Sequence, residues 1–225
     1  QGVSSAASDV YKRQVYYSGA KDNPYNPPDY LSILDKMTGT QKERLVYGKW
    51  TQAEGAVYDT FDYSTHVQER PASEFVQWYL ALDEGYTNPA VILLVGQDSD
   101  GRLHVAREFY ERGRLQSVIC ATARDWYLEK SINVAYVDEA AAGLIADLRD
   151  AGLNAIGAKG RVLDGVQIIQ NRLMVQGDIR PRLTIDPACV NLINEFESYV
   201  WKQNSAGTAR DEPVKENDHA LDALR

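Results

Sequence analysis

Residues 74–110 read EFVQWYLALDEGYTNPAVILLVGQDSDGRLHVAREFY, and this stretch decides the fold. An apolar, β-prone run from Phe75 to Leu82 is followed by a second apolar run from Ala90 to Val95. The pair Asp100-Gly101 then marks a hairpin turn. Arg102 to Tyr110 alternates apolar and polar residues, as a half-buried strand does. Three successive strands joined by short turns predict an antiparallel meander.

After the meander, the sequence alternates between helical and strand patterns. Helical spacing is found in five segments, at Leu115–Lys130, Ala140–Ala151, Arg161–Met174, Cys189–Phe196 and Asp218–Arg225. Short apolar strands are expected at three places, Asn133–Val137, Leu153–Ala158 and Leu183–Ile185. Three antiparallel strands followed by this alternation predict an α/β protein with a mixed sheet flanked by helices. The order resembles the ribonuclease-H-like arrangement.

The remaining segments are expected to be less regular. Residues 1–14 are small, polar and without periodicity, and we interpret them as a non-native tail. Residues 15–73 are expected to be a linker or arm, with two short helical pieces between Leu31 and Tyr47 and a strand-like Ala56-Val57-Tyr58. We expect the main domain to cover 74–225 and to be truncated at its C-terminus. Within it, the polar stretch Lys202–Glu216 is expected to be a loop.

Charge and hydropathy limit the function classes. The net charge is −8, which argues against a protein that coats nucleic acid but suits a site made of carboxylates. No run approaches the roughly 18 apolar residues of a membrane span, and no secretory signal opens the chain. We therefore expect neither a membrane partner nor secretion.

Acidic residues follow two of the predicted strands. Asp83 ends the first strand of the meander, and Asp138 ends the fourth strand. Ligands of open α/β sheets gather beyond the carboxyl ends of the strands. The first and fourth strands are neighbours in this arrangement, so the two carboxylates are expected to face one another. A terminal helix packed on the same edge can add Asp222.

Such a cluster of carboxylates suits phosphodiester hydrolysis. Two Mg²⁺ or Mn²⁺ ions about 3.5–4 Å apart generate the attacking hydroxide and neutralise the leaving oxygen. These hard cations prefer oxygen ligands. We expect Asp83 to bridge the ions, Asp138 to hold one and Asp222 the other. For any single acid the alternative stays open, because an aspartate after a strand often caps a turn or helix.

Several segments resemble the nuclease domain of tailed-phage terminase large subunits. They are Leu82–Pro89 (LDEGYTNP), Lys159 followed by Asp164-Gly165-Val166, Asn217–Arg225 (NDHALDALR), Tyr47–Trp50 (YGKW) and Glu54–Tyr58 (EGAVY). The resemblance implies a two-metal endonuclease that cuts concatemeric double-stranded viral DNA in the host cytoplasm. It also implies a portal protein and a small terminase subunit as partners. An ATPase motor would precede this domain, but the chain has no G-x-x-x-x-G-K-[ST] loop and is expected to cut without pumping.

The closing segment offers two auxiliary metal ligands. Asp218 and Asp222 share a helix face at i,i+4, and His219 and Asp222 share one at i,i+3. A histidine near the metals is also implied by the resemblance. The alternatives are a capping role for Asp218 and a surface role for His219.

Basic residues are candidates for DNA contact. We expect Lys159, Arg161 and Arg107 to bind phosphates without reading sequence. A solvated surface is the alternative for each of them. His66 and His104 have no matching company of ligands and are interpreted as structural.

Two other functions compete with the terminase interpretation. The first is another ribonuclease-H-like DNA nuclease of the resolvase or transposase type, which would prefer branched DNA or particular ends. The second is a non-catalytic module that docks onto the portal or the small terminase subunit, with acids that only cap helices. Such a module would not bind Mn²⁺ at the acids.

Overall fold

The computed structural model describes Tyr25 and residues 55–225 except 176 and 204–208. The described residues from 55 onward form one compact unit. The predictions for the tail at 1–14 and for the helical pieces between Leu31 and Tyr47 lie outside the described residues.

A six-stranded mixed sheet forms the centre of the compact unit, with strand order β5-β4-β1-β2-β3-β6. Its strands are β1 (Phe75–Asp83), β2 (Ala90–Asp98), β3 (Leu103–Glu111), β4 (Val134–Asp138), β5 (Ala155–Ala158) and β6 (Leu183–Ile185). The pairs β1–β2 and β2–β3 are antiparallel, which confirms the predicted meander. The strand β4 pairs in parallel with β1, as expected, and β5 and β6 extend the two sides in parallel.

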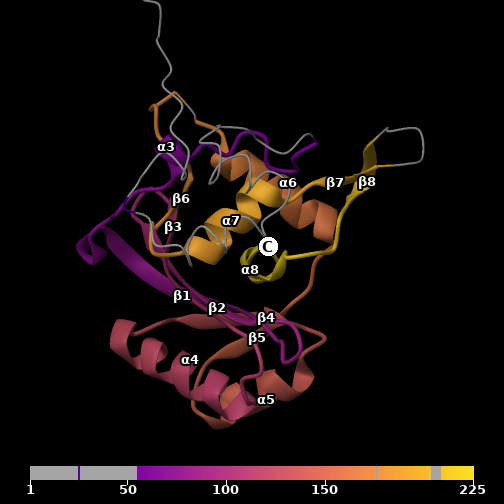
Figure 1. Cartoon of the computed structure of the whole chain (residues 1–225). Helices are drawn as coiled ribbons and strands as arrows, with labels where there is room; N and C mark the ends of the chain where they lie inside the picture. The colour runs from indigo at the N-terminus through magenta and orange to yellow at the C-terminus, as the bar shows by residue number, and fades with distance from the viewer. Residues whose placement is uncertain (1–24, 26–54, 176, 204–208) are drawn as a thin grey trace, which may run out of the picture. The chain divides into compact units, whose positions relative to one another are not determined.

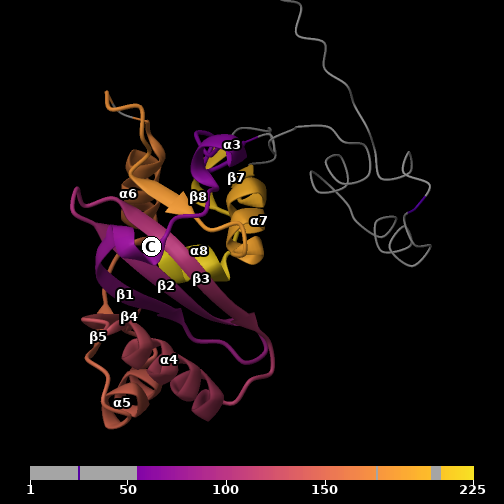
Figure 2. The ribbon, with the colours of Figure 1, turned by 90° about the vertical axis from the view of Figure 1, so that its left-hand side faces the viewer.

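Helices cover both faces of the sheet (Figures 1 and 2). On one face lie α4 (Gln116–Lys130) and α5 (Ala142–Asp150). On the other lie α6 (Val162–Leu173), α7 (Val190–Ser198) and α8 (His219–Leu224). The α/β fold predicted from the sequence is therefore confirmed. Within the described part of the chain, no helix has the length and apolar character needed to cross a membrane.

The central strand β2 explains why both faces are covered. Its first six residues, Ala90 to Val95, are all buried, because successive side chains point to opposite faces and each face carries a core. Leu80, Ile92 and Leu144 belong to the core under α4 and α5. Val91 belongs to the core under α6, α7 and α8.

The segment before the sheet contributes to the second core. Val57, Tyr58 and Phe61 are buried against Phe196 of α7, and two short helical turns follow, α3 (Tyr63–His66) and η2 (Ala72–Glu74). Residues 55–73 therefore pack with the sheet as part of the same compact unit.

Two local predictions differ from the structure. The segment predicted as a loop from Lys202 to Glu216 contains most of a two-stranded sheet, formed by β7 (Trp201–Gln203) and β8 (Ala209–Pro213). These short polar strands lack the alternation that reveals a half-buried strand. The strand-like Ala56–Tyr58 is mostly a turn, with a single bridge from Ala56 to Val200.

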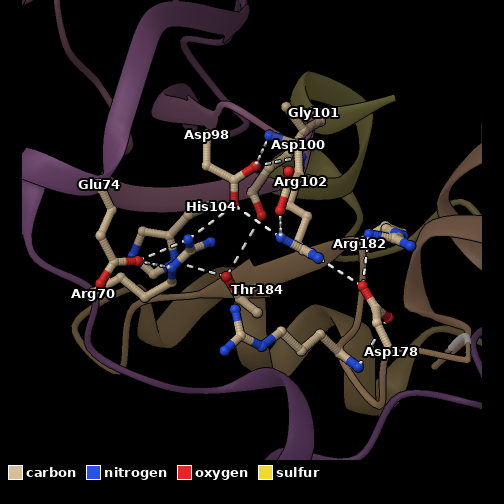
Figure 3. A network of polar contacts seen from close by, with 12 residues as sticks. Arg70, Glu74, Asp98, Asp100, Gly101, Arg102, His104, Asp178, Arg182 and Thr184 are labelled. Carbon is tan, nitrogen blue, oxygen red and sulfur yellow. Dashed lines mark hydrogen bonds and ion pairs between the residues drawn. The ribbon is translucent and has the colours of Figure 1, made fainter.

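A network of arginines and aspartates ties together the β2–β3 turn, at the opposite end of β1 from Asp83 (Figure 3). Asp98 is almost fully buried and accepts hydrogen bonds from Arg70 Nη2 at 3.0 Å and the Arg102 backbone N–H at 2.9 Å. Nη2 of Arg102 also forms an ion pair with Oδ2 of Asp178, at 2.6 Å. Burial opposes ionisation of Asp98, but the bonds from Arg70 and the backbone hold its pKa below the usual value.

Loss of the central carboxylate should destabilise the fold. We expect Asp98→Ala to lower the free energy of unfolding by about 3 kcal/mol, because it leaves buried positive charge without its partner. Asp100→Ala removes an exposed partner of the same Arg102 and should cost less than about 1 kcal/mol. Urea denaturation of both variants checks this, and equal losses would contradict it.

His104 is buried within β3, as its interpretation as a structural residue requires. Its Nδ1 lies 2.9 Å from Thr184 Oγ1, and its ring stacks on Phe75 with the centroids 5.3 Å apart. Burial lowers the pKa of His104 to about 4, with the charge of Arg70 as a smaller cause.

This lowered pKa predicts a loss of stability in mild acid. An unfolded histidine titrates near 6.5, so between pH 6.5 and pH 4 the unfolded chain binds a proton that the folded chain does not. The contribution is fully present above pH 6.5 and is lost as the pH falls toward 4. We expect about 2 kcal/mol of this loss between pH 7 and pH 5. Urea denaturation at the two pH values should show a smaller loss for His104→Gln, and identical losses would refute the assignment.

Candidate metal centre

Two aspartates end neighbouring parallel strands. In the β1–β4 pairing, Leu82 lies opposite Val137, and Asp83 and Asp138 are the next residue of each strand. Because residues in register point to the same face, the two carboxylates share the face that carries α8. The predicted juxtaposition of Asp83 and Asp138 follows from this register.

The helix α8 brings its first turn to this edge. It packs against β1 and β2 through Ala220 and Leu221, which are fully buried. Nδ1 of His219 lies 3.5 Å from Oδ2 of Asp83. The site therefore combines residues from the two strand ends with a residue more than 130 positions further along the chain than Asp83.

The pKa of Asp83 reflects its burial and the charged side chains around it. Burial is the largest cause that raises its pKa to about 6, and the charges of Asp138 and Asp218 raise it further. The charge of His219 and its hydrogen bond act in the opposite direction. Asp138 and Asp218 are thus both close enough to act on Asp83, and a positive charge at this place would offset their repulsion.

Asp138 also has a local structural role. Its Oδ1 accepts the backbone N–H of Ala140 at 2.9 Å, which stabilises the turn after β4. One oxygen of Asp138 therefore has the turn-capping role that the sequence left open as an alternative to metal binding. The side chain remains exposed at the sheet edge.

Asp218 is buried, and a residue of the protein core donates a hydrogen bond to its side chain. It occupies the position before α8, but its side chain makes no capping bond to the helix. Its Oδ2 accepts a hydrogen bond from the Tyr199 hydroxyl at 3.2 Å, and the residue is only 5% exposed. Asp222, one turn later, forms an ion pair between its Oδ1 and Arg225 Nη2.

Glu195 of α7 anchors α8, and the sequence analysis did not single it out. Its Oε2 accepts the backbone N–H of Leu221 at 2.9 Å, and the residue is buried. Burial raises the pKa of Glu195 to about 7. The available signal was its position within the apolar stripe of α7, three residues after Leu192 and next to Phe196.

The basic candidates lie in two places. Lys159 follows β5 at the same edge as Asp138, is 83% exposed and lies 3.6 Å from Glu139. Arg161 is 87% exposed and pairs with Asp164 at 3.1 Å. Arg107 is exposed beside α4, on the sheet face opposite to the acids, and donates two bonds to Glu129, at 2.7 and 2.9 Å.

The described residues contain no group of three or more histidine, cysteine, aspartate or glutamate side chains already arranged to hold a metal ion. The donor chemistry at the β1–β4 edge nevertheless fits a divalent cation. Carboxylate oxygens are the preferred ligands of Mg²⁺ and similar ions. Burial and the neighbouring carboxylates raise the pKa of Asp83, so a bound cation would stabilise its charged form.

Solved structures with a similar fold come from phage terminases. One large terminase, from a thermophilic bacteriophage, has a TM-score of 0.66 and 28% identity, over 90% of this chain and 52% of that chain. The large terminase nuclease domain of bacteriophage SPP1 with bound Mn has a TM-score of 0.56 and 17% identity, over 70% and 92%. The large terminase nuclease of thermophilic phage G20c with bound magnesium has a TM-score of 0.54 and 13% identity, over 76% and 95%.

This chain spans about half the length of the first of these large terminases. A comparison with curated proteins found no match. The family model for the terminase RNAseH like domain matches residues 99–225, which is more than half of the 225 residues. The resemblance seen in the sequence is therefore confirmed, and the chain belongs to the terminase RNAseH-like domain family.

Proposed function

We propose that this chain is a divalent-metal-dependent endonuclease domain that cuts double-stranded viral DNA during genome packaging. The observation that carries the proposal is the pair Asp83 and Asp138 on adjacent strand ends, with His219 of α8 3.5 Å from Asp83. The family supports a nuclease domain, and the metal-bound SPP1 and G20c nucleases support a divalent ion.

We keep the ligand assignment that the sequence pattern suggests. Asp83 would bridge two Mg²⁺ or Mn²⁺ ions, Asp138 would hold one, and Asp222 the other, with Asp218 and His219 as auxiliary ligands. Bound ions of this kind supply a hydroxide nucleophile and neutralise the leaving oxygen. Oδ1 of Asp222 pairs with Arg225 Nη2, so a cation at Asp222 would share this carboxylate with the guanidinium.

The protein residues around the acids have separate tasks. His219 compensates part of the charge of Asp83. Lys159 and Arg161 are exposed near the edge and would contact phosphates, exchanging weak surface pairs for the substrate. We also retain Arg107 as a phosphate contact, for which the DNA must compete with Glu129.

The packaging setting follows from the family. A portal protein and a small terminase subunit would be the protein partners, and the host cytoplasm would be the place of action. This chain matches 52% of the large terminase with 28% identity, which leaves room in that protein for the ATPase motor implied by the sequence resemblance.

Plasmid cleavage tests the proposal. The full chain should cut plasmid DNA in Mn²⁺ or Mg²⁺, and excess chelator should abolish cutting. Asp83→Asn should lower the rate by more than about 100-fold, because losing a direct ligand should cost at least as much as losing an outer-shell partner. Asp150→Asn, an exposed acid at the end of α5, is the matched control and should cut like the parent.

The outcomes separate the alternatives. Cutting that persists in chelator, or an Asp83→Asn variant as active as the parent, would refute the proposed site. A strong preference for branched over linear duplex would favour a resolvase-type nuclease. No cutting by parent protein with a normal unfolding transition would favour a docking module.

A further inference from the structure

A continuous chain of polar contacts on the side of the protein interior joins Asp218, the residue before α8, to Asp222 within it. The Tyr199 hydroxyl donates to Asp218 Oδ2 at 3.2 Å and accepts a bond from Arg225 Nη1 at 3.1 Å. Arg225 Nη2 then pairs with Asp222 Oδ1. The hydroxyl has one proton and can accept a second bond, so the two contacts are compatible.

Both linking residues are enclosed by the protein. Tyr199 is 2% exposed, and the Arg225 side chain is 6% exposed. The guanidinium also lies over the Tyr199 ring, 5.4 Å from its centroid. Burial makes each lost contact more expensive than at a surface, because water cannot replace the missing partner.

Gly165 provides the space for Arg225. A Cβ atom at this position of α6 would come within 2.9 Å of the Arg225 Cβ, closer than real Cβ contacts. Arg225 cannot move away easily at that atom, because Cβ is fixed to the backbone. The Asp164-Gly165-Val166 segment, which resembles the terminase pattern, thus acquires a physical reason for its glycine.

We propose that Tyr199 and Arg225 are positioning residues, which fix the carboxylates of Asp218 and Asp222 relative to one another for cation binding. The inference rests on the proposed metal-dependent function. Arginine suits this task because its planar fork can hold two partners in a fixed geometry. Without the link, each carboxylate gains rotational freedom, and ordering it again opposes cation binding.

The hydroxyl of Tyr199 can be tested apart from its ring. The ring packs in the core and stacks on Tyr58, with the centroids 6.1 Å apart, and phenylalanine would keep this packing. Tyr199→Phe therefore deletes the link between Asp218 and Arg225 and little else. Tyr127→Phe is the matched control, because its hydroxyl accepts a bond from Asn154 on the α4 side of the sheet.

Calorimetric titration of the full chain with Mn²⁺ alone measures the effect without any nuclease reaction. We expect Tyr199→Phe to weaken Mn²⁺ binding about tenfold, because losing a residue that hydrogen-bonds a metal ligand typically has an effect of this size. Tyr127→Phe should bind like the parent. Parent-like affinity in Tyr199→Phe would overturn the inference while leaving the proposed function intact.

A second variant covers the case in which Tyr199→Phe does not fold. Arg225→Lys keeps the positive charge but loses the fork, so it should also weaken Mn²⁺ binding several-fold. Parent-like binding by this variant would likewise overturn the inference. If the parent itself does not bind Mn²⁺, the proposed metal-dependent function fails, and the inference fails with it.

Discussion

The parallel pairing of β1 with β4 is the constraint on which the candidate site depends. Ala135 and Val137 of β4 are buried in the core under α4 and α5, so the alternate residues Tyr136 and Asp138 must point to the other face. A slip of one residue would turn Asp138 away from Asp83 and expose the apolar side chains. The hydrophobic core thus sets the register, and the register sets the distance between the two acids.

The buried carboxylates near the two ends of β1, Asp98 and Asp83, have opposite electrostatic environments. At the β2–β3 turn, Asp98 is matched by Arg70 and Arg102, and its pKa lies below the usual value. At the β4 end, the pKa of Asp83 rises to about 6, because burial and neighbouring acids outweigh the help from His219. The first arrangement stabilises the fold, and the second costs stability unless a cation binds. Such a cost, maintained by the surrounding core, is typical of sites that act on a ligand.

The local sequence pattern was sufficient to predict the antiparallel meander and to place Asp83 and Asp138 at the ends of strands. The apolar runs and the Asp100-Gly101 turn predicted the meander, and a strand-terminal aspartate is visible in the sequence itself. The anchoring of α8 was not predictable in this way. That Glu195 accepts the N–H of Leu221, and that Tyr199 bonds Asp218, depends on how α7 and α8 pack, which no local periodicity encodes. The hairpin β7–β8 was missed for a related reason, since its strands are short and polar.

The small size of α8 explains why its anchoring matters. A helix of six residues is not stable by itself in water, because nucleation costs more than so few hydrogen bonds return. Burial of Ala220 and Leu221 supplies part of what is missing, and the bond from Leu221 to Glu195 satisfies a donor that the first helical turn leaves free. The acids on this helix are therefore positioned by residues that would never touch a cation or a DNA strand. A change in the α7 core should reach the site through α8, even where every candidate ligand is intact.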